Sequence, residues 1–197
     1  MMSDLVPSGF PPSECPVGQA EVAGLATHYH EINSTCAKSD DQIAAWQKSI
    51  TDHGYLDEEQ CESFGNWKYG PSLANKIKRN TPESQKKAFS ESFNKHHPIA
   101  AARPLLSLHG FGVIVATAAL HLFHPDDFPM LDDHVLLALG VDLKSDAYAK
   151  QKDSEDFMLA LFDAYTPVFR RWCEELSVNP RDLDRAIWLR GKDLRQA

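Results

Sequence analysis

The hydrophobic and polar positions of this 197-residue chain repeat with the spacing of amphipathic helices. Proline, glycine and Asx residues separate the helical segments. Helices are expected at 18–32, 39–54, 57–70, 81–95, 113–123, 154–176 and 179–194, with a shorter one at 72–79. Because no segment has the alternation of a strand or the signature of a β-hairpin, the predicted fold class is all-α.

Capping residues support several of these helix starts. Ser39 is followed three residues later by a glutamine, as in a capping box. Thr81 and Asn179 are each followed by a proline, which suits the first helical position. Pro167 lies inside the segment 154–176, where it removes a helical hydrogen bond, so this long helix is expected to be kinked or divided.

Length and composition define the expected domain organisation. With 43% hydrophobic residues, the chain can form one or two small domains around a real core. Residues 1–17 contain prolines and serines but neither a basic start nor an apolar stretch, so they are expected to be a loose leader and not a signal peptide. Residues 18–197 are expected to form the helical domain. No apolar run reaches about 18 residues, so no membrane span is expected and the predicted location is the cytoplasm.

The charge of the chain is unevenly distributed. The net charge of −8 argues against a nucleic-acid partner. The segment from Lys68 to Arg103, however, contains eight lysines or arginines and only two acidic residues. It indicates either a basic face that binds phosphates or an ordinary solvated helix surface.

The cysteines and histidines do not predict a metal site. The four cysteines at positions 15, 36, 61 and 173 form no CxxC or CxxH pair, unlike zinc and iron–sulfur sites. His121, His124 and Asp126 have a spacing that allows two imidazoles and a carboxylate to meet a transition metal. Because no framework such as HExxH accompanies them, surface or partly buried histidines are the preferred interpretation.

The stretch 106–140 contains the residues that point to chemistry. Gly110 and Gly112 lie between two apolar helical runs, so they predict a tight turn with a positive φ at one or both positions. The next helix is expected to begin at about Val113, and its unpaired N–H groups form an anion site, although a plain helix connection explains the same residues. Asp132 stands just before an apolar run, where it suits the role of N-cap. A carboxylate held there also stays negatively charged and can stabilise positive charge on a sugar.

Two segments resemble the hallmarks of one protein superfamily. The pattern Leu108-x-Gly110-Phe111-Gly112-x-x-x-Ala116 resembles the helix–hairpin–helix signature of the HhH-GPD superfamily of DNA glycosylases. The segment 131–135, Leu-Asp-Asp-His-Val, is similar to the superfamily's segment with the catalytic aspartate. The two segments have the order and about the separation found in the superfamily, and the resemblance covers residues 18–190.

The resemblance implies two helical lobes around a cleft and DNA as the partner, bound with low sequence specificity. The hairpin at 108–112 would hold a phosphate by its main-chain N–H groups, with a monovalent cation on its carbonyls and no other cofactor. Asp132 would be the catalytic residue and face the deoxyribose of a flipped nucleotide. The expected DNA contacts are Leu108, Gly110, Phe111, Gly112, Val113, Lys68, Lys76, Lys78 and Arg79. The expected walls of the base pocket, each of which also suits the protein core, are Trp46, Phe64, Trp67 and Tyr69.

The chain departs from the superfamily at three positions. Ile114 stands where members that also cleave the DNA strand have a lysine, and an isoleucine cannot form a Schiff base. Asp133 and Leu137 replace the usual threonine and arginine. The first hypothesis is therefore a monofunctional DNA N-glycosylase without lyase activity. The alternatives are a non-catalytic DNA-binding or damage-sensing module, and an enzyme acting on modified bases or nucleosides, which the acidic composition favours.

Overall fold

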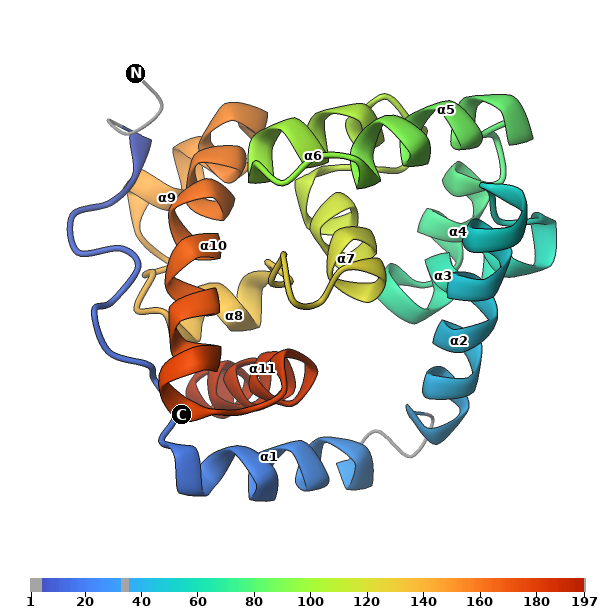
Figure 1. The fold of residues 1–197 in the computed structure, drawn as a ribbon. Coiled ribbons are helices and arrows are strands. Elements are labelled where there is room, and N and C mark those ends of the chain that lie inside the picture. Colours follow the sequence, from blue (N-terminus) through green and yellow to red (C-terminus); the bar gives the residue numbers. More distant parts are fainter. Residues whose placement is uncertain (1–4, 33–35, 197) are drawn as a thin grey trace.

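The computed structural model describes residues 5–32 and 36–196, and all the regular structure in this range is helical (Figure 1). The helices are α1 (Gln19–Ile32), α2 (Cys36–His53), α3 (Glu58–Tyr69), α4 (Pro71–Ile77), α5 (Pro82–Phe93), α6 (Pro98–Leu106), α7 (Val113–Phe123), α8 (Asp133–Ala138), α9 (Asp146–Gln151), α10 (Glu155–Leu176) and α11 (Pro180–Gln196). The predicted all-α class is thus confirmed.

Three helices, α5, α8 and α11, begin at the predicted capping residues Thr81, Asp132 and Asn179. The Thr81 side chain accepts a hydrogen bond from a backbone N–H at the start of α5, and Asn179 does so at the start of α11. Asp57 and Gln60 form a reciprocal capping box at the start of α3. All these contacts join residues two or three positions apart, which explains why the local sequence can predict Thr81 and Asn179; the box at Asp57 was not predicted.

Two helices differ from the prediction, and a third decides one part of it. α2 begins at Cys36, so Ser39 lies inside the helix and the predicted start is wrong by three residues. α9, capped by Ser145, is not predicted because its six residues are too few to show a hydrophobic period. α10 continues through Pro167 as one helix, so of the two expected outcomes, a kink or a division, the division is excluded. The proline removes one backbone hydrogen bond, but buried residues before and after it keep the helix in the core.

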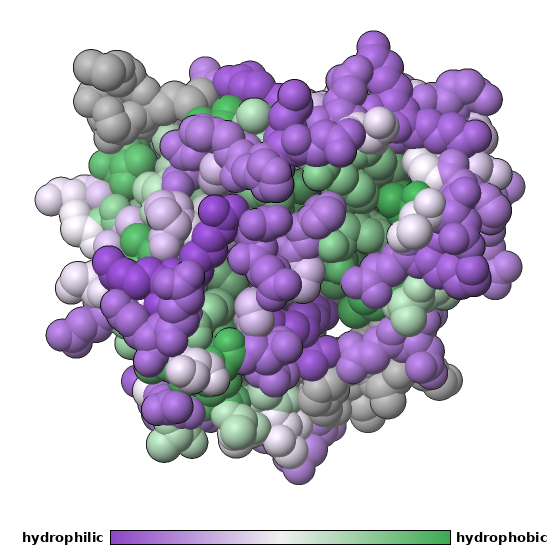
Figure 2. All heavy atoms as spheres, viewed as in Figure 1, coloured by the Kyte–Doolittle hydropathy of each residue, from purple (hydrophilic) through white to green (hydrophobic). Residues whose placement is uncertain are grey.

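α7 lies in the middle of the molecule, with the other helices around it (Figure 1). Its residues 115–122 are all buried. α6, α10 and α2 pack against α7, and α11 packs against both α8 and α1. Hydrophilic residues cover most of the face in Figure 2, and hydrophobic residues come into view mainly in its middle. In the described range, no helix is long and apolar enough to cross a membrane.

The contact between α8 and α11 depends on Gly191. A Cβ atom at this position would lie 1.7 Å from the backbone oxygen of His134 and 2.5 Å from its carbonyl carbon. Only a glycine therefore allows the two helices to approach this closely. Since Asp132 is the N-cap of α8, the contact also positions Asp132.

The segment predicted to be a loose leader contacts the rest of the protein at several points of its described part. The carbonyl oxygen of Ser13 accepts hydrogen bonds from Arg171 at 2.8 Å and from the Trp172 indole at 3.5 Å. Val17 is only 2% exposed. In Figure 1 the blue segment before α1 accordingly runs beside α10. The apolar residues in this stretch account for the packing, which the prolines and serines obscure in the sequence.

Candidate functional site

The predicted hairpin joins α6 to α7. α7 begins at Val113, as predicted, and of the two glycines Gly110 has a positive φ (86°) while Gly112 does not (−83°). The side chain of Asn80 holds the turn on both sides: it accepts from the N–H of His109 at 2.7 Å and donates to the carbonyl of His109 at 2.9 Å. The sequence did not predict Asn80, which is 29 residues away from the turn.

The start of α7 is open to an anion. Within the described part of the chain no side chain caps Gly112, whose carbonyl accepts from the N–H groups of Val115 and Ala116. The preceding N–H groups of the first turn have no helical acceptor and border a groove of about 560 Å³. Lys76 and Tyr69 also line this groove. The monovalent cation at the hairpin stays a prediction of the resemblance.

Alanine substitutions of the two glycines should have different effects on stability. Gly110→Ala forces a side chain into a left-handed conformation and brings its Cβ to 3.0 Å from Cβ of Lys76. We expect a loss of about 1–2 kcal/mol in the free energy of unfolding. Gly112→Ala has an ordinary φ and nothing within 4 Å, so we expect a change within about 0.5 kcal/mol. Urea denaturation of both variants measures the difference, and equal effects would contradict it.

Asp132 is the N-cap of α8, as predicted, and it lies in a pocket. It is 8% exposed, and its Oδ1 accepts from the N–H groups of His134 at 3.0 Å and Val135 at 3.1 Å. Its Oδ2 lies 3.3 Å from Nζ of Lys68. Among the described residues, the hydrogen bonds and the ion pair of this carboxylate are all with N–H groups or a cation, which interact favourably with its negative charge.

Lys68 lies inside this pocket and not on a basic surface. Its side chain is 7% exposed, its Nζ contacts Asp132 and the sulfur of Met130, and it lies over the rings of Trp67 and Tyr69 at 5.7 and 5.9 Å. The position suits contact with a pocket ligand better than contact with a phosphate at the surface.

Acidic residues neutralise part of the predicted basic segment. Lys78 forms an ion pair with Glu62 at 2.9 Å. Arg103 lies 3.8 and 3.6 Å from two carboxylates at the start of α10. Lys76 borders the hairpin groove, and Arg79 is exposed beside the same turn. Of the four lysines and arginines predicted to contact DNA, these last two remain at the surface near the hairpin.

The pocket around Asp132 has a volume of about 320 Å³ and a partly aromatic wall. Trp67 and Tyr69 line it as predicted. Trp46 and Phe64 do not: each is 2% exposed, and they pack edge to face in the core. The lining residues that the sequence did not predict include Tyr29, Arg181, Asp184 and Trp188. The segment 183–188 carries a signal for two of them, because Asp184 and Trp188 are four residues apart on one helix face.

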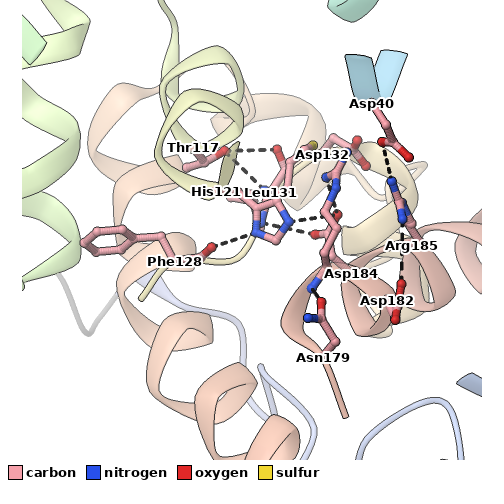
Figure 3. A network of polar contacts seen from close by, with 12 residues as sticks. Asp40, Thr117, His121, Phe128, Leu131, Asp132, Asn179, Asp182, Asp184 and Arg185 are labelled. Carbon is pink, nitrogen blue, oxygen red and sulfur yellow. Dashed lines mark hydrogen bonds and ion pairs between the residues drawn. The ribbon is translucent and has the colours of Figure 1, made fainter. Parts of the chain in front are cut away.

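A polar network lies behind the pocket (Figure 3). His121 is completely buried and contacts the carbonyl of Phe128 and the carboxylate of Asp184. His124 packs instead against the ring of Phe93. Among the described residues no group of three or more His, Cys, Asp or Glu side chains is arranged to hold a metal ion.

Comparisons with known proteins find no family model, curated protein or solved structure that matches this chain. The function must therefore be inferred from the chemistry of its residues. An aspartate with a fixed negative charge, a pocket with aromatic walls and an adjacent helix start that can bind an anion together suit a ligand with both a phosphate and a flat ring.

Proposed function

We propose that this protein is a monofunctional DNA N-glycosylase of the HhH-GPD type, which excises a modified base by hydrolysis. The observation that carries the proposal is the position of Tyr69, which lines both the hairpin groove and the Asp132 pocket. The two cavities are thus neighbours, and one bound nucleotide can occupy both. Its phosphate would lie at the start of α7 and its base in the aromatic pocket.

The hairpin groove suits a DNA backbone. Free N–H groups at the start of α7 bind a phosphate oxygen without reading the base sequence. Lys76 and Lys152 line the groove and supply positive charge, although Asp153 and Glu155 line it as well. Contacts of this kind release counterions, so DNA binding should weaken as the salt concentration rises.

The Asp132 pocket suits cleavage of a glycosidic bond. When the bond between C1′ and the base breaks, positive charge develops on the sugar. Asp132 would stabilise this charge because its own negative charge is held in place by two backbone N–H groups before the reaction begins. Trp67 and Trp188 would stack on the flipped base.

A second candidate is an enzyme that acts on free modified bases or nucleosides. The pairing of Lys78 and Arg103 with acidic residues favours it, because the surface then has fewer free cations for a long DNA backbone. The Asp132 pocket would then bind the ring of a free base or nucleoside that is not part of a DNA duplex.

Duplexes with one alkylated, oxidised or deaminated base test the proposal. We expect binding at low salt that weakens with added salt, and abasic sites in at least one duplex of the panel. Binding without any abasic site would support a non-catalytic DNA-binding module instead. No binding, together with release of a base from free nucleosides, would support the second candidate.

The absence of a lyase step can be tested separately with borohydride. Ile114 lies at the hairpin position of the lyase lysine, and the amine of Lys68 is held by Asp132 and Met130. We therefore expect no covalent adduct when the protein and abasic-site DNA are mixed with borohydride. An adduct that forms with the wild type and is lost in Lys68→Met would contradict hydrolysis without lyase activity and identify Lys68 as the nucleophile.

A further inference from the structure

A second carboxylate lines the Asp132 pocket and contacts a buried histidine. Asp184 lies on α11, and its side chain is 6% exposed. Its Oδ1 accepts a hydrogen bond from the N–H of Met130 at 3.2 Å. Its Oδ2 lies 3.6 Å from Nε2 of His121 and 3.6 Å from Arg181 (Figure 3). Asp184 thus connects the pocket with the protein interior.

The contacts of His121 define which ring nitrogen carries hydrogen. Nδ1 lies 2.8 Å from the carbonyl oxygen of Phe128, which can only accept, so Nδ1 carries the hydrogen. Burial lowers the pKa of His121, an effect that Asp184 opposes and Arg181 reinforces, so burial favours the neutral ring. Nε2 is then a bare acceptor, and no hydrogen-bond donor reaches it from the described residues.

Nε2 of His121 and Oδ2 of Asp184 are two acceptors with no hydrogen between them. A single proton on either atom would form a hydrogen bond to the other and satisfy both. Because the His121 side chain has no exposed surface, this proton reaches the pocket through Asp184. Asp132 is different, since N–H groups and Lys68 already occupy both of its oxygens.

We propose that Asp184, supported by His121, is the proton-transfer residue of the pocket, an inference that rests on the proposed base excision. The water oxygen bonds to C1′ of the deoxyribose as the bond from C1′ to the base nitrogen breaks. One water proton passes to Oδ2 of Asp184 and is shared with Nε2 of His121, and the electron pair of the broken bond leaves with the base. The proton then moves from Asp184 to that nitrogen. The products are an abasic sugar and a free base, and Asp184 returns to its initial form. Asp184 is the catalytic residue and His121 the positioning residue.

Charged and titratable groups face this pair from the neighbouring helices. They are Arg181 on α11, Lys68 on α3, Asp132 at the start of α8 and the phenol of Tyr165 on α10. Their charges change the pH at which the pair takes up a proton, but none of them donates a hydrogen bond to Nε2.

Asp184→Asn removes the proton acceptor but keeps the hydrogen bond to Met130, so it tests the catalytic role apart from the structural one. The amide oxygen still accepts the N–H of Met130, and the amide NH₂ can donate to the bare Nε2 of His121. This new hydrogen bond offsets the lost ion pair with Arg181, so we expect a melting temperature close to that of the wild type. Single-turnover excision from the duplex that the wild type processes should fall by about 10²–10⁴-fold. We expect wild-type excision to decline at acidic pH, because a proton already held by the Asp184–His121 pair prevents it from accepting the water proton. This decline should disappear in Asp184→Asn. His121→Gln should slow excision less and shift the same decline.

Asp193→Asn is the matched control, because it removes the same charge from an exposed position on the same helix. It should keep the wild-type rate, and all variants should bind a duplex with a tetrahydrofuran abasic-site analogue as the wild type does. If Asp184→Asn keeps the wild-type rate and pH profile, the inference fails while the proposed function stands. If the wild type neither binds that duplex nor excises any base of the panel, the proposed function fails.

A measurement that needs no activity tests the resting state of His121. In ¹⁵N-labelled wild-type protein at neutral pH, NMR should show hydrogen on Nδ1 and none on Nε2. In Asp184→Asn, the Nε2 signal should shift because that atom then accepts a hydrogen bond. A ring with its hydrogen on Nε2 in the wild type would overturn the inference, since Nε2 would not be available to accept the proton.

Discussion

Replacing Asp132 by asparagine should slow the proposed base excision by about 10²–10³-fold, the usual effect of removing one preorganised electrostatic stabiliser. The neutral amide cannot stabilise positive charge on the sugar. It can still cap α8, because its oxygen accepts the N–H groups of His134 and Val135 as the carboxylate does. Single-turnover excision from the duplex that the wild type processes measures the effect. If Asp132→Asn keeps the wild-type rate, Asp132 is not catalytic and serves only as the N-cap of α8.

The same substitution should destabilise the fold through Lys68. The lysine side chain is 7% exposed and loses its counter-charge in Asp132→Asn, so we expect a cost of about 3 kcal/mol in the free energy of unfolding. Lys68→Met removes the positive charge that has lost its carboxylate partner, and the methionine side chain fits beside Met130 and Trp67. The double variant should therefore recover most of the lost stability but none of the excision. Denaturation of the four proteins forms a double-mutant cycle, and additive effects would show that the two side chains do not interact.

Gly191→Ala should be the most damaging of the glycine substitutions for stability. Its Cβ would lie 1.7 Å from the backbone oxygen of His134, and a backbone atom cannot move away as a side-chain end can. α8 and α11 must separate, which we expect to cost about 3 kcal/mol and to lower the melting temperature by roughly 10 °C. Because Asp132 caps α8, excision should fall as well.

Gly24→Ala is the control for Gly191→Ala. It adds the same methyl group to a helical glycine, but nothing lies within 4 Å of the new Cβ. Alanine is a better helix former than glycine, so we expect stability to rise by up to about 1 kcal/mol. A loss of stability equal to that of Gly191→Ala would indicate a general intolerance of α1 and α11 to alanine and not a steric conflict.

The features predicted correctly from the sequence are those defined by local contacts. Helix caps such as Thr81 and Asp132 join atoms two or three residues apart, and the turn at Gly110 needs a positive φ that the neighbouring residues make evident. The continuity of α10 through Pro167 depends instead on packing with distant segments, which outweighs the local cost of the proline.

The pocket was only partly predictable, because the sequence does not tell which face of a helix meets which neighbour. Trp67 and Tyr69 at the end of α3 line the pocket, whereas Phe64, one turn earlier, packs in the core. Asp184 has the helical spacing of a residue that shares a face with Trp188, but only the packing of α11 on α8 brings it to the Asp132 pocket.

The ion pair between Lys68 and Asp132 also constrains how this protein can evolve. The two residues lie 64 positions apart, and each leaves a poorly solvated charge if the other is lost. If Asp132 were replaced in a lineage, a later replacement of Lys68 would remove the unpaired charge and restore stability. In related sequences we therefore expect positions 68 and 132 to change together.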